Sequence, residues 1–350
     1  MFLRNAWYLA AWDDEVTDAP LARRILGEPV VLYRTADGTA AALEDRCPHR
    51  AMPLSQGRVV EGDRLQCGYH GLTFATDGRC VRVPGQIMVP PGADVRAFPA
   101  VERWRGVWLW MGEPALADPA TVPAITWLDD PAWVAPRGKF DLQANYQRLV
   151  DNLLDFSHLQ FVHERTIGTD SIADIPSRTD RRPGSLAVTR WIVDRPPPPL
   201  FAKAGGFAGN VDRWMNCECL FPSNVVFDIG CARAGTGALQ GDRSQGIEIR
   251  SIHLITPATE TTTHYFWAYA RNFALADDGV TQLLAKGARA TFNEDVEILE
   301  AQQRAIARLG DPPTIDINGD AAPLQARRIL AAMIDAETAG EGTGARRHYA

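Results

Sequence analysis

Two short segments that each combine a cysteine with a histidine constrain the first part of this chain more than any other feature. Cys47 and His49 enclose one residue, and Cys67 and His70 follow after seventeen further residues. Each segment offers one thiolate and one imidazole, so a fold that brings the segments together creates a site with two sulfur and two nitrogen ligands. A tetrahedral zinc site is one interpretation, although structural zinc sites typically use Cys-x2-Cys pairs.

An iron–sulfur cluster is the interpretation that we favour for these four residues. A [2Fe-2S] cluster of the Rieske type is held by two cysteines on one iron and two histidines on the other. The segments Cys47-Pro48-His49-Arg50 and Cys67-Gly68-Tyr69-His70-Gly71 resemble the signature of Rieske proteins. This resemblance implies that Cys47, His49, Cys67 and His70 bind the cluster. Taken alone, it would also fit an electron-transfer protein that has no substrate.

The surrounding sequence predicts a small all-β domain followed by a second domain. With 350 residues, the chain has room for roughly two domains. From Trp7 to Met111, short runs of β-forming residues alternate with turn signals such as Asp37-Gly38 and Asp77-Gly78. Two prolines in the stretch 117–123 then interrupt this pattern. We therefore expect a first domain at 1–115 and a second at 116–350.

The second domain is expected to combine helices with an antiparallel sheet. Apolar residues recur at helical spacing from Tyr146 to about His163, and again from Val280 to Leu309, where Gly310 stops the pattern. Residues that favour strands concentrate at 224–229, 246–256 and 261–270. We expect the proline run 196–199 to form a loop and the tail from residue 339 to be frayed.

Charge and composition exclude several classes of protein. The formal net charge is −7, so the chain as a whole repels a phosphate backbone, and no nucleic-acid partner is expected. No apolar run approaches the roughly 18 residues of a membrane helix, and acidic residues follow the apolar start where a signal-peptide cleavage site would stand. The six cysteines are too few to stabilise a chain of this length by disulfide bonds, so free thiols or metal ligands are expected. We therefore predict a cytoplasmic protein with no membrane association.

A second metal site is predicted in the second domain. His158 and His163 are five residues apart, about 140° on an ideal helix, so they can face one ion only if the helix breaks or ends between them. Asp295, or its neighbour Glu294, would complete the set from a distant helix. Two imidazoles and one carboxylate form the facial triad that holds mononuclear Fe(II) and leaves positions open for dioxygen. The alternative is a surface helix with two unrelated histidines.

The order of the two motifs resembles the α-subunits of Rieske non-haem iron oxygenases. An Asp-x2-His-x4-His pattern and a late aspartate belong to the iron site of that family, which implies His158, His163 and Asp295 as the ligands. The resemblance also implies that Asp155 links His158 to a cluster histidine, His70, across a subunit boundary, because the two centres of one chain are too far apart for fast electron transfer. A homotrimer is therefore implied. A carboxylate hydrogen-bonded to a ligand imidazole is a common device for fixing its tautomer.

Segments along nearly the whole chain resemble the vanillate O-demethylase, dicamba O-demethylase and toluenesulfonate methyl-monooxygenase group. They lie at 5–8, 84–86, 144–152, 211–214, 256–261, 264–267 and 270–273. The resemblance implies an α+β chain, in which the all-β Rieske domain precedes a helix-grip (START-like) catalytic domain with an antiparallel sheet and long helices. Asn152 matches a catalytic-site residue near the iron in the demethylase branch, and a polar helix residue without a role at the metal is the alternative.

The reaction implied by this resemblance uses O2 and electrons from NAD(P)H to hydroxylate a methyl group of a small aromatic acid. No glycine-rich nucleotide-binding fingerprint opens a βαβ unit in this sequence, so a separate reductase of the flavin or ferredoxin type is expected. Oxidative O-demethylation of a methoxybenzoate such as vanillate, which releases formaldehyde, is the first expectation. The alternatives are methyl hydroxylation of a toluenesulfonate-like substrate and, in a different class, a non-catalytic Rieske electron-transfer or ligand-binding protein.

Candidates for substrate contacts are fewer. His253 matches a substrate-side histidine of the dicamba enzyme, although a strand histidine satisfied by its neighbours fits the sequence as well. Cys217 and Cys219 fall on a strand that lines the pocket in relatives, and as residues i and i+2 they share a face without any third metal. Lys286 and Arg289 are candidates for binding a substrate carboxylate or sulfonate, with a solvated helix face as the alternative.

Overall fold

The structure is a computed structural model that describes residues 1–164, 166–168, 175–310 and 312–344. It divides into two compact units. The first consists of Met1–Ala124, Thr256–Glu260 and the C-terminal residues from Glu337, and the second of Ile125–Ile255 and Thr261–Ala336. The domain boundary expected after residue 115 stays a prediction. Among the described residues, no helix is both long enough and apolar enough to cross a membrane.

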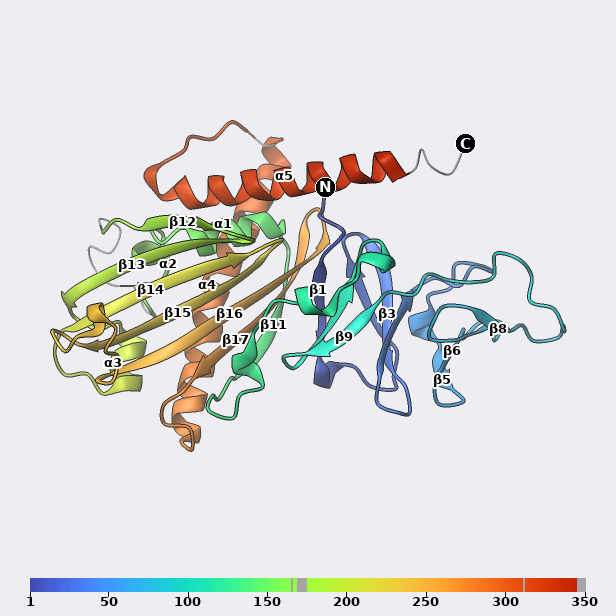
Figure 1. Cartoon of the computed structure of the whole chain (residues 1–350), viewed down its shortest axis with the longest axis horizontal. Coiled ribbons are helices and arrows are strands. Elements are labelled where there is room, and N and C mark those ends of the chain that lie inside the picture. Colours follow the sequence, from blue (N-terminus) through green and yellow to red (C-terminus); the bar gives the residue numbers. More distant parts are fainter. Residues whose placement is uncertain (165, 169–174, 311, 345–350) are drawn as a thin grey trace. The chain divides into compact units, whose positions relative to one another are not determined.

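The N-terminal part of the chain is built from short strands, coloured blue to cyan in Figure 1. Its strands are β1 (Trp7–Trp12), β2 (Leu21–Ile25), β3 (Glu28–Arg34), β4 (Ala40–Glu44), β5 (Arg58–Val60), β6 (Arg64–Gln66), β7 (Thr73–Phe74), β8 (Cys80–Arg82), β9 (Ala100–Arg103) and β10 (Gly106–Trp110). They form three antiparallel sheets in the orders β1-β10-β9, β2-β3-β4 and β5-β6-β7-β8. The expected all-β domain is confirmed.

The core of this domain explains why the sequence forms strands there. All six residues of β1 and all five of β10 are buried, so both strands are continuous apolar runs instead of alternating ones. A second buried group surrounds the two cysteines of the cluster motif and includes Tyr33, Leu65 and Phe74. Cys47 and Cys67 therefore lie at the edge of a packed apolar core, which fixes the backbone that presents them.

The second part of the chain contains a large antiparallel sheet and the long helices. Its strands are β11 (Arg137–Leu142), β12 (Arg178–Arg182), β13 (Ser185–Arg195), β14 (Val211–Leu220), β15 (Asn224–Arg233), β16 (Gly246–Thr259) and β17 (Thr262–Arg271), in the order β11-β17-β16-β15-β14-β13-β12. Its helices are α1 (Tyr146–Leu154), α2 (Leu159–Val162), α3 (Pro199–Gly205), α4 (Asp278–Leu309) and α5 (Ala321–Gly344). Short 3-10 turns lie at Asp13–Glu15, Leu54–Gln56, Pro114–Leu116, Pro119–Thr121, Thr126–Leu128, Ala238–Gln240 and Asn318–Asp320. The expected fold class, an all-β domain followed by a sheet with long helices, is confirmed.

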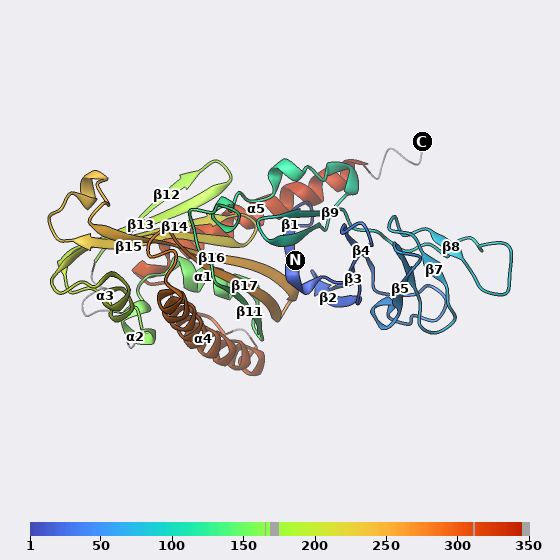
Figure 2. The same cartoon turned by 90° about the horizontal axis from the view of Figure 1, so that it is seen from below.

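Helix α4 follows one face of this sheet, and α1, α2 and α3 lie on the same side (Figure 2). The helix begins where the Asp277 side chain accepts a hydrogen bond from the Val280 amide, and it ends at Gly310, whose φ of 73° is the left-handed conformation that glycine adopts easily. Its buried residues form one stripe, at Leu284, Ala288, Thr291, Phe292, Asp295 and Leu299. A carboxylate thus lies within an otherwise largely apolar stripe.

Three local predictions were wrong. The helix expected from Tyr146 to His163 is interrupted after Leu154 and resumes as the single turn of α2. The proline run does not remain a loop throughout, because Pro199 is the first residue of α3, a position where its missing amide proton costs nothing. The tail expected to fray from residue 339 is helical as far as Gly344, at the end of α5.

Candidate functional site

The two cysteine–histidine segments form loops with the same pattern of backbone hydrogen bonds. The amide of Cys47 donates to the carbonyl of Met52 at 2.8 Å, and the amide of Cys67 donates to that of Leu72 at the same distance. The residue four positions after each cysteine donates back to the cysteine carbonyl, at 2.9 Å for Ala51 and 3.2 Å for Gly71. Both of these residues have positive φ angles, 55° and 74°. The two cysteines are therefore presented by equivalent turns.

The histidines of these loops are exposed, whereas the cysteines are buried. The imidazole rings of His49 and His70 lie 4.4 Å apart between centroids. Burial, together with the neighbouring Cys67 thiol, raises the pKa of Cys47, so the thiolate needs a positive partner such as iron. Two buried sulfurs and two adjacent exposed imidazoles fit a [2Fe-2S] cluster with its histidine-bound iron near the surface.

His158 and His163 lie beside each other at the two ends of the short helix α2. His158 caps the beginning of α2 and His163 its end, and the Nε2 atoms of the two rings are 3.3 Å apart. A continuous helix would turn these side chains about 140° away from each other. The end of α2 at Val162, which lies between the two histidines, is thus the condition for both of them to face one point.

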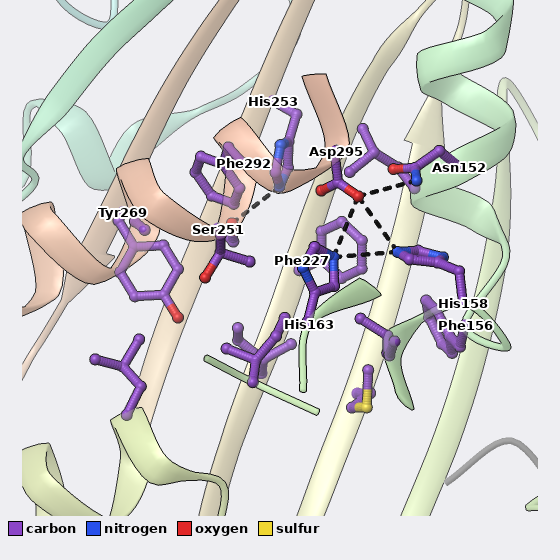
Figure 3. A pocket seen from close by; sticks show the side chains of 18 of the residues that line it. Asn152, Phe156, His158, His163, Phe227, Ser251, His253, Tyr269, Phe292 and Asp295 are labelled. Carbon is purple, nitrogen blue, oxygen red and sulfur yellow. Dashed lines mark hydrogen bonds and ion pairs between the residues drawn. The ribbon is translucent and has the colours of Figure 1, made fainter. Parts of the chain in front are cut away.

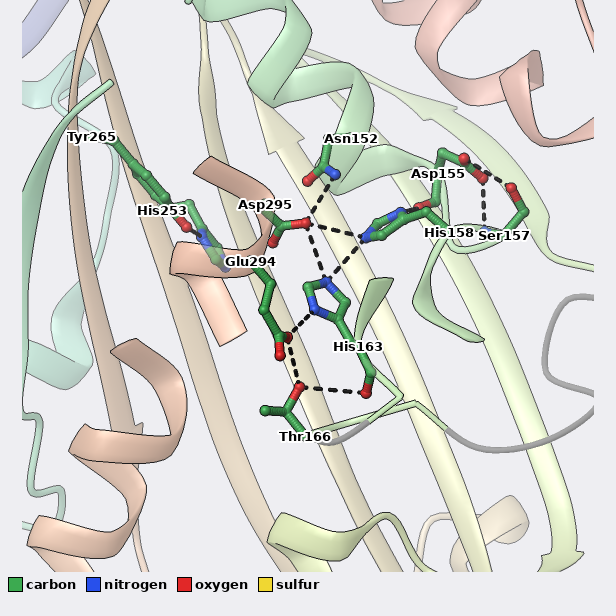
Figure 4. A network of polar contacts seen from close by, with 10 residues as sticks. All are labelled: Asn152, Asp155, Ser157, His158, His163, Thr166, His253, Tyr265, Glu294 and Asp295. Carbon is green, nitrogen blue, oxygen red and sulfur yellow. Dashed lines mark hydrogen bonds and ion pairs between the residues drawn. The ribbon is translucent and has the colours of Figure 1, made fainter. Parts of the chain in front are cut away.

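Asp295 completes this group from α4. Its Oδ1 lies 3.1 Å from His163 Nε2 and 3.5 Å from His158 Nε2, and it accepts a hydrogen bond from Asn152 Nδ2 at 3.0 Å (Figure 4). Within the described part of the chain, only one group of three or more histidine, cysteine, aspartate or glutamate side chains has ligand atoms that all lie within 4.8 Å of one another. It consists of His158, His163 and Asp295. His163 and Asp295 are buried.

The other carboxylate considered from the sequence, Glu294, has a different place. Its Oε2 accepts a hydrogen bond from His163 Nδ1 at 2.8 Å and another from Thr166 Oγ1 at 3.0 Å. Neighbouring residues on a helix point about 100° apart, so Asp295 faces the Nε2 atoms while Glu294 holds the far side of the His163 ring. The sequence did not reveal the roles of Glu294 and Thr166.

The hydrogen bonds around the two rings show that the group fits a cation. His158 Nδ1 lies 2.6 Å from the carbonyl oxygen of Asp155, and His163 Nδ1 lies against the Glu294 carboxylate, so each Nδ1 carries the proton. Each neutral ring then directs an Nε2 lone pair at the other and at the Asp295 oxygen. Three lone pairs that converge in a buried place repel one another unless a positive charge lies between them.

The pKa directions agree with this picture. Burial lowers the pKa of His158. Burial also opposes the charged form of His163, but the hydrogen bonds and charges of Asp295 and Glu294 outweigh it and raise the pKa of His163. In the absence of metal, a single proton is thus drawn to the place where the lone pairs converge. A divalent metal ion would replace it there.

Two further predicted residues lie close to this group. The Asn152 amide nitrogen holds Asp295, while Asn152 Oδ1 is buried and has no hydrogen-bond partner within the described chain. The Asp155 carboxylate accepts hydrogen bonds from the amide and the hydroxyl of Ser157, both at 2.8 Å, and contacts His158 through its backbone carbonyl. The link from Asp155 to a cluster histidine of another subunit stays a prediction.

A pocket opens beside these residues (Figure 3). Its walls are largely apolar and come from Leu153, Phe156, Leu159, Leu200, Phe201, Met215, Phe227, Ile229 and Phe292. His253 also lines it, as predicted for a substrate-side residue, but both ring nitrogens have partners, Ser251 Oγ at 2.9 Å and Tyr265 Oη at 2.6 Å. Its contact with substrate stays a prediction. A mostly apolar pocket with a few polar groups is typical of small-molecule sites.

The remaining candidates do not reach the pocket. Lys286 and Arg289 are both exposed, and the Arg289 guanidinium lies over the ring of Phe140. Cys217 and Cys219 are buried free cysteines, as expected from their spacing on β14. A charged residue that the sequence analysis did not single out, Arg213, lines the pocket instead. The sequence carries only a partial signal for Arg213, because alternation along β14 places it on the same face as Met215, Cys217 and Cys219.

Comparisons with known proteins support both metal sites. The model of the Rieske [2Fe-2S] domain matches residues 6–99, and that of the vanillate O-demethylase oxygenase C-terminal domain matches residues 142–336. The iron-sulfur subunit TsaM1 of the toluene-4-sulfonate monooxygenase system from Comamonas testosteroni is 42% identical over 345 residues, covering 97% of this chain and 99% of the relative. A vanillate O-demethylase oxygenase subunit from Pseudomonas sp. (strain HR199 / DSM 7063) is 36% identical over 343 residues, covering 96% of each chain.

Solved structures give the same result. The crystal structure of dicamba monooxygenase bound to dicamba has a TM-score of 0.87 and 37% sequence identity, and covers 97% of this chain and 99% of its own. A second structure of that enzyme, with non-heme iron and dicamba, has a TM-score of 0.83 and 35% identity over 97% and 99% of the two chains. Since both domain models match and the similarity extends over almost the whole chain, this chain belongs to the Rieske non-haem iron oxygenases, as an oxygenase subunit of the vanillate O-demethylase family.

Proposed function

We propose that this oxygenase component oxidises a methyl group of a small aromatic acid with O2, and that O-demethylation of a methoxybenzoate such as vanillate is its reaction. The observation on which the proposal depends is the group of two imidazoles and one carboxylate at the wall of a largely apolar pocket, in a chain that also has a Rieske domain. Such a pocket would hold an aromatic ring and exclude water around its methyl group.

Each of the two cofactors of the family has a set of residues to hold it. We assign the [2Fe-2S] cluster to Cys47, His49, Cys67 and His70, because their loops present two buried sulfurs and two exposed imidazoles. We assign the mononuclear iron to His158, His163 and Asp295, whose lone pairs converge. When bound there, Fe(II) supplies the activation of dioxygen, and two imidazoles with one carboxylate leave coordination positions open for it.

The surrounding residues orient these ligands. Glu294 and the Asp155 carbonyl each hold a proton on the Nδ1 atom of one histidine, which leaves both Nε2 atoms free to bind metal. Asn152 donates to Asp295 and holds its carboxylate in position. Its own carbonyl oxygen, which is buried without a partner in the described structure, is available as an acceptor in the pocket. We therefore assign Asn152 to the catalytic site.

Electrons reach this chain from another protein. The named relatives include oxygenase components of dicamba O-demethylase and chloroacetanilide N-alkylformylase, and a component system requires a separate reductase. We propose an NAD(P)H-dependent reductase with a flavin or an iron–sulfur cluster, and a homotrimer in which Asp155 links the iron of one subunit to His70 of the next. The six free cysteines agree with a reducing, cytoplasmic environment.

A second candidate reaction is hydroxylation of an aryl methyl group in an arenesulfonate. The observation in its favour is the sequence identity, which is 42% to the toluene-4-sulfonate monooxygenase subunit and 36% and 38% to two vanillate O-demethylase subunits. Both reactions begin with oxygen insertion into a methyl C–H bond. They differ in the product, because a hydroxylated methyl ether loses formaldehyde whereas a hydroxylated aryl methyl group is a stable alcohol.

Product analysis distinguishes these reactions. The loaded protein is combined with a surrogate reductase, NADH and a panel of methoxy- and methyl-substituted benzoates and benzenesulfonates. Formaldehyde with the matching phenol supports O-demethylation, and a benzylic alcohol without formaldehyde supports hydroxylation. Iron analysis is the control: two irons per chain in fully loaded protein, with no product, would contradict the enzyme assignment and favour an electron-transfer or ligand-binding protein.

A further inference from the structure

The pocket is lined by a buried arginine that has few partners among the described residues. Arg213 lies on β14 and is 3% exposed. Its Nη1 donates to the carbonyl of Ile167 at 3.2 Å, and its guanidinium lies 5.7 Å from the centre of the Phe201 ring. Its Nε has no hydrogen-bond partner among the residues that the structure describes. A guanidinium has five N–H donors, so most of the hydrogen-bonding capacity of Arg213 is unused.

Several other arginines in the same unit have more hydrogen-bond acceptors, although the Nε atoms of Arg190 and Arg271 also have no hydrogen-bond partner among the described residues. Arg271, which is fully buried, donates to the carbonyls of Phe273, Ala274 and Asp277 and to the Thr281 hydroxyl.

Arg243 and Arg250 both form ion pairs with Asp228 and Glu248. Arg213 thus differs from all three, because a single neutral acceptor is seen for it in the part of the chain that the structure describes.

An unpaired buried cation is costly. The penalty for removing it from water is normally offset by a carboxylate and further hydrogen bonds. Burial lowers the pKa of Arg213 to about 10, so the side chain is still charged at neutral pH. Its titratable neighbours give no compensation, because burial raises the pKa values of Cys231 and Tyr269 and keeps both groups neutral. The pocket therefore contains a positive charge that an anionic ligand would neutralise.

A second potential donor lines the same pocket. Tyr269 is buried, and it is among the residues that form the pocket wall together with Arg213. In Figure 3 it lies on the side of the pocket away from His158. Both side chains line one pocket, from strands β14 and β17 of the same sheet. Together they offer a charged fork and a hydroxyl, the donors that bind carboxylate or sulfonate oxygens well.

The position of Arg213 along its strand separates it from the proposed iron site. Cys217, four residues later on β14, lies against the carbonyl of Leu153 in α1, next to Asn152. Four strand residues span about 13 Å, so Arg213 lies well along the sheet from this end. Apolar side chains, among them Met215 and Phe227, line the pocket as well. The pocket thus has a metal-binding end, apolar walls and a cationic end.

We propose that Arg213, assisted by Tyr269, binds the carboxylate or sulfonate group of the aromatic substrate and so directs the methyl end of the ring towards the iron ligands. This assignment rests on the proposed function for the choice of an aromatic acid. It names the residue that distinguishes an acid from a neutral aromatic compound. An aromatic acid that buries its anionic group here would pair the arginine and leave its apolar ring against apolar walls.

Ligand binding tests this proposal without turnover. Loaded protein in dioxygen-free buffer is titrated by calorimetry with 4-methylbenzoate, 4-methylbenzenesulfonate and the neutral 4-methylbenzamide. The wild type should bind at least one of the two anions more tightly than the amide. Arg213→Gln should weaken binding of that anion by about 10- to 100-fold, as expected for charge-assisted hydrogen bonds, and binding of the amide less than threefold. If the variant loses more affinity for one of the two anions than for the other, that anion identifies the anionic group of the substrate.

A matched control separates contact from general charge. Arg190 lies on the neighbouring strand opposite Met215, is also buried, and donates to the carbonyl of Phe156. It is not among the residues that line the pocket. Arg190→Gln removes the same charge and should leave the preference for anions over the amide unchanged.

Three results would overturn the proposal: no preference for anions in the wild type, an equal loss for all three ligands in Arg213→Gln, or an equal loss of preference in Arg190→Gln. If Arg213→Gln does not fold, Arg213→Lys decides instead. Lysine keeps the charge but not the fork, so a loss of several-fold confined to the anions supports the proposal, and an equal change for the amide refutes it. Anion binding through Arg213 without any methyl oxidation would refute the proposed function and leave this inference intact.

Discussion

Replacing Glu294 is expected to weaken iron binding without removing any ligand. Its Oε2 accepts hydrogen bonds from His163 Nδ1 at 2.8 Å and Thr166 Oγ1 at 3.0 Å. The carboxylate thereby fixes the His163 ring and makes its Nε2 a stronger donor to metal. Glu294→Gln keeps an acceptor of the same size but loses the charge, and Glu294→Ala loses both.

The magnitude follows from the kind of hydrogen bond that is lost. A hydrogen bond to a charged group contributes about 1.5–3 kcal/mol, and a neutral one about 1 kcal/mol. The glutamine variant should therefore lose about 1 kcal/mol of iron-binding free energy, or roughly fivefold in affinity, and the alanine variant about 2–3 kcal/mol, or roughly 30- to 150-fold. The Glu294 side chain is 29% exposed, so solvent screening favours the lower end of each range.

Chelator competition measures this effect. Loaded protein is titrated with a ferrous chelator, and the mononuclear iron that remains is measured by residual turnover and iron analysis, with the absorbance of the [2Fe-2S] cluster as an internal standard. Glu297→Gln is the control, because Glu297 is exposed, lies one turn further along α4 and hydrogen-bonds only to Asn293 Nδ2 among the described residues. Identical chelator midpoints for wild type and Glu294→Ala would refute the reasoning, as would an equal loss in the Glu297 control.

Three further predictions concern the same unit. Asp295→Ala should lose the mononuclear iron and turnover while keeping the cluster spectrum, and an iron content equal to the wild type would contradict the ligand assignment. Asp155→Asn should keep both metal centres yet nearly abolish turnover, and loss of iron together with activity would make Asp155 structural. Burial lowers the pKa of His253 to about 3, so the folded chain keeps it neutral while the unfolded chain protonates it below about pH 6.5. His253 therefore leaves stability unaffected above that pH and costs up to about 1.4 kcal/mol per pH unit as the pH falls towards 3. In urea unfolding between pH 7 and pH 5, His253→Gln should remove this part of the pH dependence, and unchanged slopes would argue against a neutral buried histidine.

The sequence predicted which candidate metal ligands lie together better than it predicted their surroundings, for a physical reason. Cys47, His49, Cys67 and His70 lie in two loops whose geometry is local, so their spacing alone indicates the chemistry. By contrast, the choice between Glu294 and Asp295 depends on how α4 is rotated against the loop after α1, which is a property of packing between distant segments.

The residues of the pocket were harder to predict. Arg213 follows the inward alternation of β14, but a charged residue in an apolar strand is recognisable as buried only when the neighbouring strands are known. Lys286 and Arg289 looked equally suitable from their place near Asp295, yet they are on the exposed side of α4. Helix α5 was not predicted, although its buried residues Ala322, Ala326, Leu330 and Ile334 recur at helical spacing.

The equivalent turns around Cys47 and Cys67 have a consequence for how such a cluster can evolve. Their frame is made of backbone hydrogen bonds and two positive φ angles, so it does not depend on the side chains at the exposed positions Arg50 and Tyr69. Substitutions there would change the charge and solvent access around the cluster, which are determinants of reduction potential, while the sulfur positions stay the same. The electron affinity of the centre can thus be adjusted to a new reductase without rebuilding the fold that holds it.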